Sequence, residues 1–309
     1  MVPSVEPLST ATISDAISRT ERSVASIVAA LFLHAIAMER SSGTGPCYRR
    51  ALPPTARLTS PVATFLQPPA IVAALRDLHP TQVQVIKRDG DAEVLAATLL
   101  GQSVIIKRWR ARSAYEKLKM KLGLGRASRH ARGTRLLQSC GIPTAAVLAS
   151  QLTPEQDGAL AQTLILERLA GKTVLQHLAD EDLSPRQQHA LARRIALDMA
   201  ALLRAGYYNR DHKPSNLIVT STDAADPRVA VIDTVAIRRA GDVGAIRMLA
   251  SLYIEPLGCG VPPRRALAFR VVRTLANEGL GKPYQQLWMY AGNVIRNHGD
   301  ARPKVDPLR

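Results

Sequence analysis

A polar turn that leads straight into an apolar segment contains side chains suited to phosphoryl transfer. Residues 207–216 read YYNRDHKPSN and continue into LIVT. Transfer of a nucleotide γ-phosphoryl group needs a carboxylate to accept the proton of the attacking hydroxyl, oxygen ligands for Mg²⁺ and a cation that positions the phosphates. Asp211 and Asn216, spaced as D-x-x-x-x-N, offer a base and an amide ligand, and Lys213 would offset charge on the transferred group.

Two residues elsewhere supply the remaining parts. VAVIDT places Asp233 at the end of an apolar strand, and VIIK places Lys107 at the end of another. Strand ends hold side chains rigidly, as catalytic geometry requires. Each residue alone has an ordinary explanation, because an Asp there usually forms a turn and a Lys there usually meets solvent. Their order along the chain favours a kinase-like site: a lysine on a strand comes first, then a loop with Asp and Asn, and then an Asp after a short hairpin.

The elements that must position these residues fall into two groups. An antiparallel meander is predicted first, then a basic helix-prone segment and two further strands; from residue 174 the pattern is mainly helical. The predicted strands are Val83–Ile86, Val94–Leu100, Val104–Lys107, Val147–Leu148, Thr163–Glu167, Leu217–Val219 and Val229–Ile232, and the predicted helices lie within 108–137, 174–179, 185–205, 242–255 and 264–277. Ser184 is the expected N-cap of the long helix that starts at Pro185.

This pattern predicts an α+β fold with two lobes. Residues 76–168 would form a β-rich N-lobe with one main helix, and residues 169–309 a mostly helical C-lobe. Residues 1–75 would form an N-terminal extension, with a helical segment at 14–40 and a Pro/Ser-rich linker at 41–70.

Composition narrows the partners. The 309 residues carry a formal charge of +16, which favours an anionic partner. Aromatic residues make up only 4% and no reading motif is present, so a nucleic-acid partner is not expected. The three cysteines show no paired spacing and the N-terminus lacks a basic signal region, which fits a reducing cytoplasm.

The motifs together resemble those of the protein-kinase-like fold. VIIKRW is similar to the V-A-I-K motif, NRDHKPSN to H-R-D-L-K-x-x-N, and VIDT to the segment that contains D-F-G. Within that fold the chain resembles the lipopolysaccharide core kinases of the Kdo/WaaP type, because GIPTAAVLA (141–149) is similar to their G-I-P-T-P element. Basic residues also follow both the lysine strand and Asp233, as in that family.

The resemblance implies a role for each matching residue. Asp211 would be the catalytic base, assisted by Lys213, with Asn216 and Asp233 as Mg²⁺ ligands. ATP would be bound by Lys107, by the turn at Gly90, and by a hinge near Glu167 and Leu169. The implied activity is ATP- and Mg²⁺-dependent phosphorylation of a sugar hydroxyl on a lipopolysaccharide inner-core-like glycolipid, of the Kdo or heptose kinase type, at the cytoplasmic face of the inner membrane.

Basic residues suggest how an anionic acceptor would be bound. Eleven lysines and arginines lie between Lys107 and Arg135 against the single acid Glu116. A solvated helix face is the simpler explanation of such a run, and a patch that attracts the acceptor or a membrane surface is the functional one. Arg110, Arg238 and Arg239 are the predicted acceptor contacts.

The sequence also departs from the kinase pattern. The glycine-rich loop is reduced to Asp89-Gly90-Asp91, and the segment SRHARGTRLLQSC lacks the glutamate that usually pairs with the lysine. Glu116 is the only nearby candidate for that role. These departures leave open a catalytically weak pseudokinase or adaptor that binds an anionic partner. A protein kinase or an antibiotic-phosphorylating enzyme is a further alternative, but no A-P-E-like element follows Asp233.

Overall fold

The computed structural model describes residues 68–298 and residue 308, apart from 77–78, 80–81, 112, 156 and 280–281. The helical segment predicted at residues 14–40 and residues 41–67 of the predicted linker lie outside these residues, and the last three positions of that linker, 68–70, are helical in the structure. The described residues belong to one compact unit.

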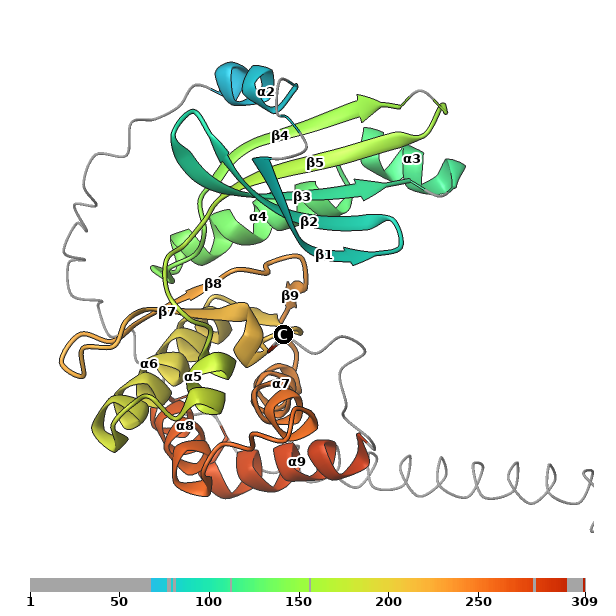
Figure 1. Cartoon of the computed structure of the whole chain (residues 1–309). Helices are drawn as coiled ribbons and strands as arrows, with labels where there is room; N and C mark the ends of the chain where they lie inside the picture. Colours follow the sequence, from blue (N-terminus) through green and yellow to red (C-terminus); the bar gives the residue numbers. More distant parts are fainter. Residues whose placement is uncertain are drawn as a thin grey trace, which may run out of the picture. The chain divides into compact units, whose positions relative to one another are not determined.

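A five-stranded antiparallel sheet, in the order β1-β2-β3-β5-β4, forms the first part of this unit (Figure 1). The strands are β1 (Val83–Asp89), β2 (Ala92–Leu99), β3 (Gln102–Arg110), β4 (Val147–Pro154) and β5 (Leu160–Glu167). Lys107 lies on the central strand, opposite Val94 of β2 and Leu164 of β5. The strand that carries the lysine is therefore held by hydrogen bonds on both sides.

A short helix before the sheet also belongs to this lobe. Helix α2 (Pro68–Arg76) packs Ile71, which is 1% exposed, into a cluster with Leu99, Val104 and Ile165 of the sheet. The packed lobe thus includes residues ahead of the position 76 expected from the sequence.

The basic segment after β3 forms two helices instead of one. Ser113 caps α3 (Ala114–Lys121) by accepting a hydrogen bond from Glu116 N, and α4 (Arg126–Ser139) follows. Gly123, with φ +69°, adopts the left-handed backbone conformation between them, which interrupts the helix. Helix α4 packs against β4 and β5 and buries His130, Gly133, Thr134 and Leu137.

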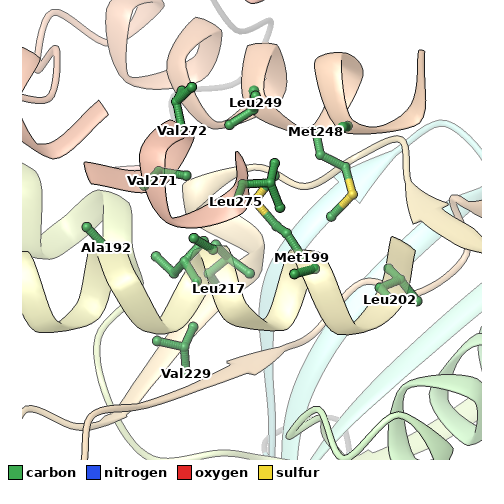
Figure 2. Close-up of a cluster of buried hydrophobic side chains, with 14 of the residues drawn as sticks. Ala192, Met199, Leu202, Leu217, Val229, Met248, Leu249, Val271, Val272 and Leu275 are labelled. Carbon is green, nitrogen blue, oxygen red and sulfur yellow. The ribbon is translucent and has the colours of Figure 1, made fainter. Parts of the chain in front are cut away.

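The helical lobe is built around α6. Its helices are α5 (Val174–Asp180), α6 (Pro185–Arg204), α7 (Gly244–Gly258), α8 (Arg265–Asn277) and α9 (Tyr284–Asn297). Ser184 and Gln187 form the expected capping box, with Pro185 at the first helical position. The fully buried Met199 of α6 lies in one hydrophobic cluster with Met248 of α7 and Leu275 of α8 (Figure 2). Helix α9 was not predicted.

Two small antiparallel ribbons carry the polar residues between α6 and α7. The first pairs β6 (Tyr207–Asn209) with β9 (Ile237–Arg239), and the second pairs β7 (Leu217–Ser221) with β8 (Arg228–Val231). The 3₁₀ turn η2 (Pro214–Asn216) leads into β7. Because the ribbons are nested, the segments 210–216 and 232–236 lie side by side.

Candidate active site

The loop from Arg210 to Asn216 is fixed by its own side chains. Asp211 N donates to Asn209 Oδ1 over 3.1 Å, and Asn216 Nδ2 donates to Asp211 O over 3.0 Å. Lys213 Nζ lies 3.0 Å from Asp211 Oδ1. The three residues predicted in this loop are therefore in direct contact with one another, with an ammonium group beside the Asp211 carboxylate.

A buried glutamate on α7 also holds this loop in place. Glu255, 8% exposed, accepts hydrogen bonds from Ser215 N at 2.9 Å and from Ser215 Oγ at 2.6 Å. Ser215 precedes Asn216, so the position of the amide depends on a residue 40 positions away. Sequence reasoning missed Glu255, because no local pattern marks a long-range contact of this kind.

Asp233 is brought to the loop by backbone and side-chain hydrogen bonds. Ile232 N donates to Asn216 O over 3.0 Å, and Asn209 Nδ2 donates to Asp233 O over 3.3 Å. Asn209 is 1% exposed and contacts both the Asp211 and the Asp233 segments. It stands where the kinase motif has histidine, and its amide joins the two halves of the site.

Lys107 reaches this site from the other lobe. Its Nζ donates to Ile232 O over 3.3 Å, next to Asp233. Burial lowers the pKa of Lys107, and the negative charges of Asp233 and Asp211 oppose that shift. Lys107 is thus close enough to interact electrostatically with both carboxylates. The four residues predicted from separate motifs therefore converge on one site.

The helix that lacks a glutamate presents His130 instead. Its Nδ1 lies 3.9 Å from Asp233 Oδ1, too far for a hydrogen bond, and the ring is fully buried. Burial, followed by the charge of Lys107, lowers the pKa of His130 to about 3, so the imidazole is neutral at pH 7. The charges acting on Lys107 are those of Asp233 and Asp211, while Glu116 lies in the first turn of α3. His130 was not singled out from the sequence.

Oxygen ligands for a cation are available at the loop. The amide nitrogen of Asn216 is used by Asp211 O, which leaves its oxygen as the acceptor. Asp233 Oδ1 accepts from Val235 N at 3.3 Å, and the second carboxylate oxygen adds a further acceptor. Amide and carboxylate oxygens are the hard ligands that Mg²⁺ prefers, together with phosphates and water. No cluster of three or more His, Cys, Asp or Glu side chains forms a metal site in the described residues.

The remaining predicted ATP contacts lie on the sheet and at its exit. Gly90, with φ +56°, forms the β1–β2 turn. Glu167 ends β5, its backbone N–H donates to Ala146 O, and Leu169 packs partly buried behind it. No hydrogen bond or ion pair joins these three residues directly to Asp211 or Asp233 in the described part of the chain.

The predicted acceptor contacts separate into two places. Arg110 forms ion pairs with Glu155 and Asp157, which both lie in the connection between β4 and β5. Arg238 and Arg239 lie on β9, opposite Tyr208 and Tyr207 of β6 and close to the loop that holds Asp211. Only the β9 arginines are thus brought near the proposed base.

Comparison with known proteins identifies this arrangement. A profile of the lipopolysaccharide kinase (Kdo/WaaP) family matches residues 73–239, more than half of the chain, and spans every predicted catalytic and metal-binding residue. The chain belongs to the lipopolysaccharide kinase (Kdo/WaaP) family. Membership makes it a kinase, and a kinase uses ATP.

A solved structure agrees with the assignment of the fold. The chain is similar to WaaP, solved in complex with acyl carrier protein, with a TM-score of 0.53 and 18% sequence identity over 73% of this chain and 91% of that one. The kinase-like two-lobe fold predicted from the sequence is therefore confirmed. A comparison with curated protein sequences found no match.

Proposed function

We propose that this kinase transfers the γ-phosphoryl group of ATP to a sugar hydroxyl of a lipopolysaccharide inner-core-like glycolipid. The convergence of Lys107, Asp211, Asn216 and Asp233 supports the proposal most strongly, because they come from three separate segments and meet at one site. A scaffold without catalytic activity has no need of all four.

Each residue has one task in the proposed reaction. Asp211 accepts the proton of the attacking sugar hydroxyl, and Lys213, 3.0 Å from its carboxylate, offsets charge on the transferred group. Lys107 binds the α- and β-phosphates of ATP. The turn at Gly90 and the backbone from Glu167 to Leu169 would contact the nucleotide.

Asn216 and Asp233 would hold Mg²⁺ through their side-chain oxygens. When bound, the ion neutralises charge on the β- and γ-phosphates. Asn209 keeps the two ligand segments in register, and Glu255 fixes the backbone next to Asn216. Precise placement of this kind supplies much of the rate enhancement in phosphoryl transfer.

The proposed acceptor determines where the enzyme would work. It is an anionic, lipid-linked sugar, so we expect cytoplasmic enzyme to make peripheral contact with the inner membrane through basic residues. Among the described residues, no helix has the length and apolar character required to cross a bilayer.

The phosphate content of lipopolysaccharide tests this function in cells. Cells that lack the chain should make lipopolysaccharide with less core phosphate, and expression of the wild-type chain should restore it. Asp211→Asn should not restore it. Equal phosphate content with and without the chain would favour the adaptor alternative.

A cavity in the helical lobe supports a second, binding function. It measures about 540 Å³ and is lined mainly by apolar side chains of α6, α8 and α9, with Arg265 and Arg296 among the lining residues. The similar WaaP was solved in complex with acyl carrier protein. We infer that an acyl chain presented by such a carrier would occupy this cavity.

Thermal stability with and without the carrier tests this binding. The acylated carrier should raise the melting temperature of the wild-type chain more than the unacylated carrier does. Ala268→Phe, which fills the cavity, should abolish the difference, whereas Ala266→Phe, exposed on the same helix and outside the cavity, should preserve it. An equal response to both carriers would contradict the inference.

A further inference from the structure

Five arginines form a cluster around Arg129 of α4, and one of them is the neighbour of Asp211 in the chain. Arg129 of α4 interacts electrostatically with four other arginines, from α4, from the loop and from β9: Arg126, Arg132, Arg210 and Arg238. Arg210 directly precedes Asp211 in the chain. The cluster therefore borders the proposed catalytic base.

Tight packing fixes the three segments relative to one another. Thr234 Oγ1 donates to His130 O of α4 over 2.7 Å, and Arg210 N donates to Ala236 O over 3.2 Å. Gly133 lies so close to the same segment that a Cβ there would stand 2.4 Å from Thr234 O. The arginines are thus presented by a rigid framework and not by a long loop.

The positive charges of this cluster are not neutralised within the described part of the chain. No ion pair joins any of the five arginines to an acidic side chain there. Arg238 donates only to the backbone oxygens of Val235 and Ile237, and Arg129 Nε is buried without a partner. Arginines elsewhere do pair with acids: Arg194 with Asp198, Arg204 with Glu278 and Arg228 with Asp226.

A cluster of positive charges that no acidic side chain neutralises favours the binding of an anion. Burial, followed by the charges of Arg238, Arg126, Arg132 and Arg210, lowers the pKa of Arg129. A bound anion would relieve this repulsion and satisfy the free donors. Guanidinium groups bind phosphate through two parallel hydrogen bonds, and several of them can share the oxygens of one phosphate.

We propose that Arg129, Arg210 and Arg238 form a phosphate-binding site that holds a phosphate group already present on the acceptor glycolipid. The proposal rests on the proposed function and adds to it the group by which the acceptor is oriented. With that phosphate held beside Arg210, a nearby sugar hydroxyl would face Asp211. The enzyme would then select acceptors that carry a phosphate near the reacting hydroxyl.

Binding of inorganic phosphate tests the site without any need for activity. Phosphate, titrated at constant ionic strength, should stabilise the wild-type chain and Arg135→Gln, which removes an exposed charge from the same helix. Arg129→Gln should bind phosphate about tenfold more weakly than the wild type. The affinity of Arg129→Lys should lie between those two, because lysine keeps the positive charge but cannot form the two parallel hydrogen bonds of a guanidinium group. Unchanged phosphate affinity in a folded Arg129→Gln variant would overturn the site.

Kinetics with two acceptors identify the source of the phosphate. Arg129→Gln should raise the KM for the phosphorylated acceptor about tenfold and leave the KM for ATP unchanged, while the enzymatically dephosphorylated acceptor should show no such difference. If phosphate binding is lost but the KM for the phosphorylated acceptor is unaffected, the site serves another phosphate and the assignment to the acceptor is wrong. Absence of transfer by the wild type would instead count against the proposed function.

Discussion

Asn209 and Asp233 are joined by a hydrogen bond of 3.3 Å from the side-chain amide of Asn209 to the backbone oxygen of Asp233. The same amide accepts from Asp211 N, so one buried side chain connects the proposed base and a proposed metal ligand. The kinase motif has histidine at this position, and asparagine, like a neutral histidine, can donate one hydrogen bond and accept another.

Asn209 should therefore affect the reaction through the positions of Asp211 and Asp233 and not through a contact of its own with the substrate. Asn209→Leu removes both hydrogen bonds, and we expect kcat to fall by about 10- to 100-fold because the two segments lose their register. Asn209→His should retain most of the activity, since a ring N–H can still donate to Asp233 O. Steady-state kinetics with saturating ATP measure both variants. A Leu variant as active as the wild type would contradict this role.

The contact between Glu255 and Ser215 should support both stability and catalysis. Glu255→Ala leaves the partly buried Ser215 N–H and hydroxyl without their acceptor, which should cost about 2–4 kcal/mol of unfolding free energy. Ser215→Ala removes only the hydroxyl bond and should cost about 1 kcal/mol. Urea unfolding of both variants and of the double variant measures the coupling. Equal losses in the two single variants would show that the backbone bond has no role.

The close approach of α4 to Asp233's neighbour Thr234 requires glycine at position 133. A methyl group there would stand 2.4 Å from Thr234 O and 2.8 Å from Thr234 Cβ, so Gly133→Ala should destabilise the chain by about 1–3 kcal/mol. Gly292→Ala is the matched control, because its nearest atom would be Arg296 Nη1 at 3.8 Å. That helical substitution should stabilise by about 0.5–1 kcal/mol. Thermal unfolding distinguishes the two, and a neutral Gly133→Ala would contradict the packing.

The buried Asp198 should make stability depend on pH. Burial raises the pKa of its carboxyl group to about 6, although Arg194 opposes the shift. The folded protein therefore keeps a proton that the unfolded chain has released near pH 4, so this group makes the fold less stable as pH rises from about 4 to about 6.

Asp198→Asn removes that dependence. The unfolding free energy of the wild type relative to the variant should fall by about 1–3 kcal/mol between pH 4 and pH 7.5. Denaturant unfolding at several pH values gives this difference. A constant difference over the whole range would show that Asp198 ionises normally.

The sequence predicted what local patterns and motif spacing determine. The strand that carries Lys107, the capped start of α6 at Ser184 and the order of Asp211, Asn216 and Asp233 were all readable, because each depends on neighbouring residues. Convergence of those residues followed from resemblance to a known fold. The structure then supplied the contacts that bring them together.

The rest depends on long-range packing. The buried His130 of α4 lies close enough to Lys107 to be affected by its charge, and Glu255 of α7 reaches Ser215, 40 residues earlier in the chain. Arg110 looked equivalent to Arg238 in the sequence, yet a pair of acids on the β4–β5 connection holds it apart. Such outcomes depend on which segments meet, and one sequence does not contain that information in local form.

Transfer of ³²P from labelled ATP to purified lipopolysaccharide core acceptor tests the central claim most directly. The wild type should label the acceptor in a Mg²⁺-dependent manner, and Asp211→Ala should reduce the rate by at least about 100-fold while it still binds ATP. Calorimetric titration with Mg-ATP provides the binding control. No labelling by the wild type, or equal labelling by Asp211→Ala, would contradict the account.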